Sequence, residues 1–189
     1  MDVHVKFGLS KEVYNRIFIW ENALREAYSN LKVEDHIMKN MDRVDNRCNF
    51  EMAGQPCYTH SSLAACHALT EIAVILVRQV FSTGEKGNGI ASNRGNNEVD
   101  KIREEMEHYA KKQLSWSDQE YTDFYRLIRD RRNQLLAHYD GVAAEYSEPA
   151  PWMSTIKMIG ANLCKSERDK LEELVKVMLE FIIAKIRPM

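Results

Sequence analysis

The fold prediction starts from SDQEYTDFYRLIRDRRNQLLAHYDG, residues 117–141. This segment opens with Ser117-Asp118-Gln119-Glu120, the S-x-x-E order of a capping box, which marks the start of a helix. Apolar and aromatic residues then recur every three or four positions, as on one face of a helix, until Gly141, which is expected to end it. The residues expected on the buried face are Tyr121, Phe124, Tyr125, Ile128, Leu135 and Leu136.

Helices are predicted on both sides of this segment. Upstream, apolar residues three and four apart predict a helix over residues 9–41 with Ser10 as its N-cap, a second that starts at 59–61 and ends at 81, and a third over 98–112 capped by Asn97. Downstream, a last helix is expected to start at Ser166-Glu167-Arg168-Asp169. Its apolar stripe, from Leu171 to Ile186, suits either the core or a partner helix.

The connections between these helices are rich in helix breakers. Residues 84–97 hold four of the eight glycines and predict a loop, whose Lys86 and Arg94 could approach a nucleic-acid backbone or belong to a simple connection. Residues 141–165 predict a long connection with a short extended piece at 155–159, because Pro149 and Pro151 disfavour a regular element directly after Gly141. Strand-like alternation is nearly absent. We therefore expect a single all-α domain over residues 1–189, an up-and-down bundle of four to five helices with a long loop before the last helix.

The composition limits the class of protein. The chain has 189 residues, 44% of them hydrophobic and 29% charged, with a formal net charge of −2. This net charge argues against a surface coated in positive charge, so any contact with RNA is expected to be local. The cysteines lack zinc-ribbon spacing and disulfide density, and no signal peptide or membrane-spanning run is found, which predicts an unprocessed, soluble protein of the reducing cytoplasm without a membrane partner.

Residues 129–140 hold the side chains best suited to chemistry. Arginine can grip a phosphate through two parallel hydrogen bonds and keeps its charge, and histidine transfers protons near neutral pH. Such a set can move a phosphoryl group without metal, and no cofactor is expected. At about 100° per residue, Arg131 and His138 lie along one edge of the helix, whereas Arg132 is turned about 120° away from His138.

The nine residues RNQLLAHYD, from Arg132 to Asp140, resemble the signature of HEPN domains, an arginine followed by four to six residues and a histidine. Their arginine-polar-x-x-x-Ala-His-x-Asp form resembles the abortive-infection, AbiU2-like branch, and Arg78-Gln79-Val80-Phe81 extends the resemblance to the second helix. The resemblance implies an all-helical, often homodimeric, metal-independent ribonuclease of toxin–antitoxin or phage-defence systems.

The resemblance also implies roles for individual residues. Arg132 would hold the phosphorane oxygens, His138 would be the base or acid, and Asn133 would orient the phosphate or the imidazole. Arg131 is the substitute phosphate clamp, and Asp140 either orients the imidazole or caps the turn. RNA brings its own nucleophile, the 2′-hydroxyl, so the expected products carry a 2′,3′-cyclic phosphate and a 5′-hydroxyl.

The helical wheel and the resemblance favour different arginines as the neighbour of His138. Two arrangements reconcile them: the helix unwinds before Gly141 and swings His138 toward Arg132, or a second subunit supplies the opposing residue across a two-fold axis. The resemblance favours the dimer. Some HEPN toxins have a tyrosine two residues after the histidine, which an antitoxin modifies; Asp140 stands there, so regulation by that route is not expected, and the antitoxin partner is left open.

The same arginines also suit other functions. An arginine run is typical of a solvated helix edge, and the helix dipole favours histidine near a helix C-terminus without any catalysis. The bundle would then bind a nucleotide, RNA or an acidic partner without reaction, or act as an interaction module through the stripe of residues 171–186.

Two further groups of polar residues are candidate sites. His67 and Glu71, four residues apart, could be catalytic or could be satisfied side chains of the core. Cys57, His60, Cys66 and His67 are zinc-type ligands, but the last two are adjacent in a helix and point about 100° apart. No metal is therefore expected.

Overall fold

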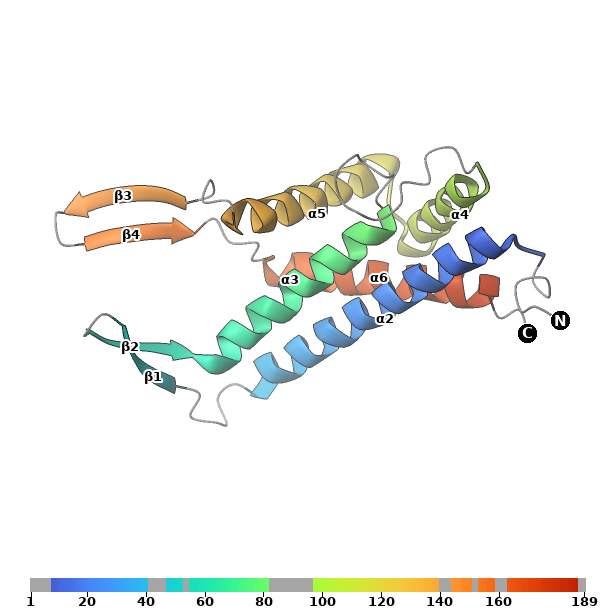
Figure 1. Cartoon of the computed structure of the whole chain (residues 1–189). Coiled ribbons are helices and arrows are strands. Elements are labelled where there is room, and N and C mark those ends of the chain that lie inside the picture. Colours follow the sequence, from blue (N-terminus) through green and yellow to red (C-terminus); the bar gives the residue numbers. More distant parts are fainter. Residues whose placement is uncertain are drawn as a thin grey trace.

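The described part of the chain contains five α-helices, which confirms the all-α prediction (Figure 1). The computed structural model describes residues 8–40, 47–52, 55–81, 97–139, 144–150, 153–158 and 163–186, without the side chains of the strands or of residues 61, 63, 64, 97 and 134–139. The helices are α2 (Lys11–Asn40), α3 (Ser61–Phe81), α4 (Asn97–Leu114), α5 (Asp118–Tyr139) and α6 (Lys165–Ile186). The predicted boundaries agree with these to within a few residues.

Local hydrogen bonds fix where α2 and α5 begin. The backbone N–H of Val13 donates to Ser10 Oγ at 3.3 Å, so Ser10 is the N-cap of α2 as predicted. At the start of α5, the N–H of Ser117 donates to Glu120 Oε2 at 2.8 Å, and the N–H of Glu120 donates to Ser117 Oγ at 3.2 Å. These two reciprocal bonds are the predicted capping box.

The start of α6 differs from the prediction. Cys164, not Ser166, is the residue before the first turn: its N–H donates to Glu167 Oε2 at 2.7 Å and its carbonyl accepts from the N–H of Arg168 at 3.0 Å. Glu167 lies three residues after Cys164 and can therefore reach back to that N–H, which places Ser166 inside the helix.

The helices pack as an up-and-down bundle around α2. α2 lies along both α3 and α6, α6 also contacts α4, and α3 contacts α5. Figure 1 shows that α2 and α5 end at the side of the bundle where α3 and α6 begin. The C-terminal part of α5, which carries the predicted site, is therefore at that end of the molecule.

One cluster of buried side chains joins all five helices. The α2 stripe contributes Val13, Ile17, Trp20, Leu24, Ala27 and Leu31. The α6 stripe contributes Leu171, Leu174, Val175, Met178, Ile182 and Ile186. The apolar face of α6 is thus used within the chain, which removes the interpretation of this stripe as a free surface for a partner helix. Among the described residues, no helix is long and apolar enough to cross a membrane.

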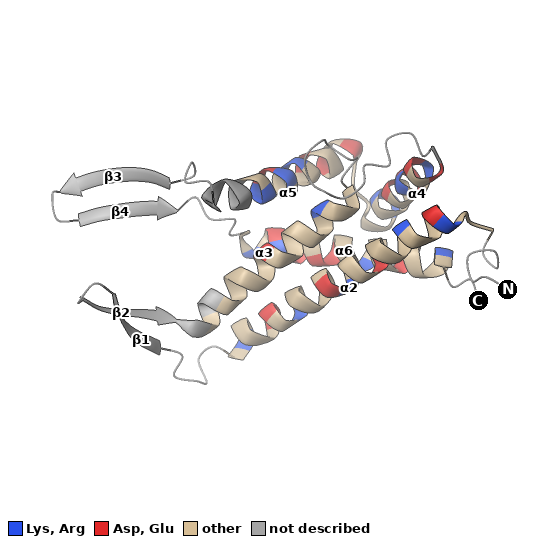
Figure 2. Cartoon of the chain, in the orientation of Figure 1, with Lys and Arg blue, Asp and Glu red and all other residues tan. Residues whose placement is uncertain are grey.

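α3 is the most apolar helix, with Glu71 and Arg78 as its only charged residues, and Figure 2 shows it largely free of charge. Cys66, Thr70, Val74 and Val77 are buried. Ile72 is 41% exposed, on a side of α3 that the other helices leave uncovered.

Two antiparallel hairpins interrupt the connections and extend from the same end of the bundle (Figure 1). β1 (Arg47–Met52) pairs with β2 (Gln55–His60) between α2 and α3, and β3 (Ala144–Ala150) pairs with β4 (Met153–Met158) between α5 and α6. β4 corresponds to the predicted extended piece. β3 corrects the expectation that the prolines prevent a regular element: the strand forms, and its register shifts between Ser147 and Ala150, beside Pro149, which lacks an N–H for the ladder.

Candidate functional site

The arginine-rich segment forms the last turns of α5. The helix is continuous from Asp118 to Tyr139, so its backbone is still helical at His138. The helix therefore does not unwind ahead of His138. This excludes one of the two arrangements that would bring His138 to Arg132. The side chain of His138 and the whole of Asp140 lie outside the described residues.

The regular helix decides which arginine is the neighbour of His138 within one chain. Residues seven apart project within about 20° of each other, whereas residues six apart diverge by about 120°. Arg131 and His138 thus share an edge of α5, and Arg132 projects from a different side. The geometry of one regular helix alone thus does not bring positions 132 and 138 together.

The arginines of α5 differ in what neutralises them. Arg126 and Arg129 each form an ion pair with an aspartate of the same helix, at 3.6 and 3.0 Å. Arg132, which is partly buried, donates from Nη1 to Oδ1 of Asn133 at 3.2 Å, and no carboxylate pairs with it within the described part of the chain. Asn133 is exposed. Among the described side chains, Arg132 is therefore held by a neutral amide and has no carboxylate that compensates its positive charge.

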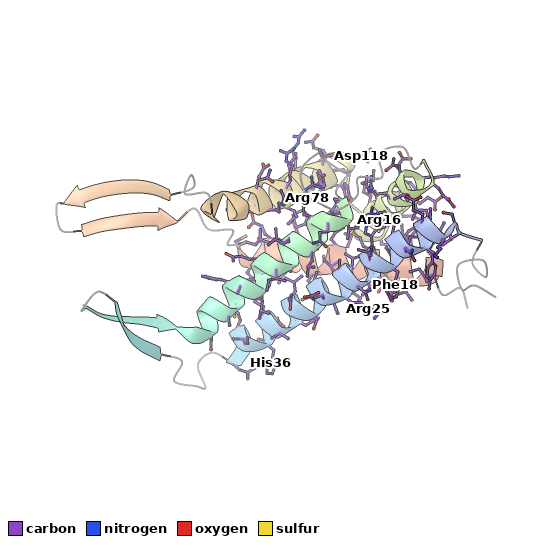
Figure 3. The ribbon with its side chains drawn as sticks, in the orientation of Figure 1. Arg16, Phe18, Arg25, His36, Arg78 and Asp118 are labelled. Atoms are coloured by element: carbon purple, nitrogen blue, oxygen red, sulfur yellow. The ribbon has the colours of Figure 1, made fainter. Side chains whose placement is uncertain are left out.

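Arg78 brings a second guanidinium to α5 from α3 (Figure 3). It is buried, and its Cζ lies 5.4 Å from the centroid of the Tyr125 ring, in the range of a cation–π contact. Phe81 contacts the same ring edge-to-face, with centroids 5.2 Å apart. In the sequence, Arg78 stands out as the lone basic residue of an apolar helix, and no spacing along the chain indicates its contact with Tyr125.

α3 and α5 run antiparallel and meet where Arg78 and Phe81 contact Tyr125, and they diverge toward the C-terminus of α5 (Figure 1). Glu71 forms no ion pair with Arg132, and no hydrogen bond joins Glu71 to His67; all three of these side chains are described. The structure therefore does not place Glu71 in a catalytic pair.

Tyr121, one turn before Tyr125, is not a proton acceptor at neutral pH. Its hydroxyl is buried without a hydrogen-bond partner among the described residues. Burial raises the pKa of Tyr121 far above its ordinary value, and the carboxylate of Glu107 raises it further. Tyr121 therefore stays protonated and acts as part of the core.

The zinc-type ligands are not assembled in the described part of the chain, where no group of three or more His, Cys, Asp or Glu side chains could hold a metal ion. Cys66 is buried and its thiol donates to the backbone oxygen of Glu34 at 3.8 Å. The side chains of Cys57 and His60 lie outside the described residues, as do Lys86 and Arg94.

No protein-family model, curated protein or solved structure matches this chain.

Proposed function

We propose that the end of α5 binds RNA phosphate and that the protein is a metal-independent endoribonuclease of the HEPN type, acting as a toxin or in phage defence. One observation carries the proposal. Arg132, six residues before His138, has an amide neighbour and no acidic partner among the described side chains, whereas the arginines one and two turns earlier are neutralised. An uncompensated guanidinium is what a phosphate site needs, because it can give two parallel hydrogen bonds to a single anion.

The reaction follows from the chemistry of RNA. His138 accepts the proton of the 2′-hydroxyl as the 2′-oxygen forms a bond to phosphorus, and the bond from phosphorus to the 5′-oxygen breaks. A general acid returns a proton to the leaving 5′-oxygen. Arg132 stabilises the charge that builds up on the non-bridging oxygens, and Asn133, whose Oδ1 is engaged by Arg132, has its NH₂ group left to orient the phosphate. Products are a 2′,3′-cyclic phosphate and a 5′-hydroxyl.

A homodimer supplies what one chain lacks. Since Arg132 and His138 project from different sides of a regular helix, the proposed site pairs Arg132 of one subunit with His138 of the other across a two-fold axis. Water serves as the general acid for the leaving 5′-oxygen, so each site needs one Arg132 and one His138. Arg131, on the same edge as His138, assists in holding the RNA strand.

The test is cleavage of a labelled RNA in excess EDTA, read as the appearance of cyclic-phosphate ends. We expect Arg132→Ala and His138→Ala each to lower the rate by about 100-fold or more, the usual loss for a charge-stabilising group or an acid–base group. Arg126→Ala is the matched control, because Arg126 lies on the same helix but is neutralised by an aspartate. Cleavage that survives both changes rules the proposal out.

A second candidate function is phosphate binding without reaction, since the contact between Arg132 and Asn133 is complete without His138. Binding of this kind weakens with added salt and leaves the RNA intact. It also predicts that His138→Ala keeps full RNA affinity while Arg132→Ala loses it. Cyclic-phosphate products from the wild-type protein would exclude this alternative.

A further inference from the structure

A second polar site lies in a cavity between the C-terminal half of α2 and the first turns of α6. Its volume is about 250 Å³, room for several water molecules, since each occupies ~30 Å³ in the liquid. Leu31 and Met38 give it an apolar part, and the other lining residues are charged. Each lining residue belongs to a described part of the chain. In Figure 3, the label of His36 marks the last part of α2, which contributes Glu34, Asp35, Met38 and Lys39 to the cavity.

Glu34 is the buried carboxylate of this cavity. The residue is 4% exposed and lines the cavity with its side chain. Arg168 Nε lies 3.3 Å from Glu34 Oε1, but the N–H does not point at that oxygen, and Oε1 accepts no hydrogen bond. Burial raises the pKa of Glu34 more than Arg168 lowers it. Glu34 therefore has an acceptor that lacks a donor, in a place with room for one.

The other charged residues that line the cavity favour a positively charged ligand. Four carboxylates line it, against three cationic side chains. Lys39 and Lys32 already engage Asp35 and Glu172, respectively. Asp169, on the exposed side of the cavity, has no ion-pair partner among the described side chains. An anion would meet these carboxylates, whereas a cation would satisfy both Glu34 and Asp169.

We propose that this cavity binds a small aliphatic diamine, with one ammonium group donating to Glu34 Oε1, the second close to Asp169, and the alkyl chain on Leu31 and Met38. A primary ammonium group offers three donors at the end of a narrow chain, which fits a single buried acceptor better than a planar guanidinium does. This site is separate from the arginines of α5, and the proposal does not depend on the nuclease activity.

The binding depends on pH in a defined direction. Glu34 must be ionised to hold an ammonium group, and its charge is influenced by Arg168 and Asp169 from α6, Asp35 from α2 and His67 from α3. Because the pKa of Glu34 is raised, affinity for the diamine is expected to fall as the pH falls through that raised value, while the alkylammonium groups stay protonated.

The experiment is isothermal titration of the full chain with 1,4-diaminobutane, and in parallel with 1,4-butanediol, which has the same carbon chain without charge. We expect saturable binding of the diamine and none of the diol. Glu34→Gln, which keeps the shape of the side chain, is expected to weaken diamine binding at least tenfold. Glu26→Gln, the same change on the exposed face of α2, is expected to leave it unchanged.

A second variant keeps the test informative if Glu34→Gln fails to fold. Met38 lines the cavity and is 38% exposed, so Met38→Trp fills the space from the rim with little effect on the core. Loss of diamine binding in this variant supports the proposal. The proposal is overturned if the wild-type protein does not bind the diamine, if the diol binds equally well, or if binding persists unchanged in Glu34→Gln or Met38→Trp.

Discussion

Among the described residues, Arg132 lacks an acidic partner and one oxygen of Glu34 lacks a hydrogen-bond donor. The energetic cost differs, because Arg132 is partly exposed and Glu34 is buried. Arg132 is partly exposed and next to a neutral amide, so water screens its charge and the protein tolerates it at little energetic cost. Glu34 is buried beside Arg168, with one oxygen that accepts no hydrogen bond. A buried carboxylate in this state favours its neutral form, and its ionisation destabilises the fold.

The pH dependence of stability is expected to report Glu34. Because its folded-state pKa lies above the ordinary value of 4.5, the folded chain holds this proton more tightly than the unfolded chain does. Its contribution to stability is therefore present at acid pH and lost as the pH rises through the raised pKa. We expect the free energy of unfolding of the wild-type protein to fall relative to that of Glu34→Gln as the pH rises above the ordinary value of 4.5.

Urea denaturation followed by circular dichroism at several pH values measures this difference. Taking the difference between the two proteins removes the opposite contributions of Asp35, Asp118 and Glu120, whose pKa values are lowered by hydrogen bonds. Glu26→Gln serves as the control for loss of a carboxylate from the same helix. If the unfolding free energies of wild type and Glu34→Gln changed equally with pH, burial would not raise the pKa of Glu34.

At the level of the helix, the capping box of α5 offers a direct stability test. Ser117 Oγ accepts from the N–H of Glu120 at the first turn. Ser117→Ala removes this acceptor, and we expect a loss of about 1 kcal/mol of unfolding free energy, measured by urea denaturation. Ser29→Ala is the matched control, because Ser29 is exposed in the middle of α2. Equal effects of the two changes would show that the capping box contributes nothing specific.

Helices were the most predictable elements, because their signals are local. The capping box at Ser117 and the three- and four-residue spacing on α2 and α6 are read from neighbouring residues, and the structure confirms them. Cys164 was missed because a cysteine is a rare N-cap and its capping partner is the carboxylate of Glu167. β3 was missed because proline lowers strand preference, although a hairpin tolerates it where the register shifts.

The candidate site was less predictable than the helices, because it depends on contacts between them. The sequence places Arg131, Arg132 and His138 on one helix, but not the stacking of Arg78 on Tyr125 or the ion pairs that neutralise the other arginines. The cavity at Glu34 was not predicted at all. Its walls come from α2 and α6, and no spacing along the chain indicates that residues 34 and 168 meet.

At the scale of the whole molecule, we expect two chains to contribute different residues to each proposed site. If Arg132 comes from one subunit and His138 from the other, unfolding and refolding an equal mixture of Arg132→Ala and His138→Ala proteins should restore activity. Half of the refolded dimers are mixed, and each has one complete site out of two, so we expect about a quarter of wild-type activity. Each variant refolded alone is the control.

An inactive mixture would place Arg132 and His138 in the same subunit. Sedimentation of the mixture distinguishes this result from a failure to exchange subunits, because one of the two chains can carry a mass tag. A particle with the mass of a single chain at working concentration would contradict the dimer itself.

The pairing of α2 with α6 has a consequence for biosynthesis. α2 is translated first, and the helix that covers part of its apolar face is the last of the five, 124 residues further along the chain. At about 5–20 residues per second, the ribosome needs roughly 6–25 s to make that intervening length. During this interval the nascent chain has α3 to cover one side of α2 but not α6 to cover the other, so part of an apolar face stays exposed to aggregation.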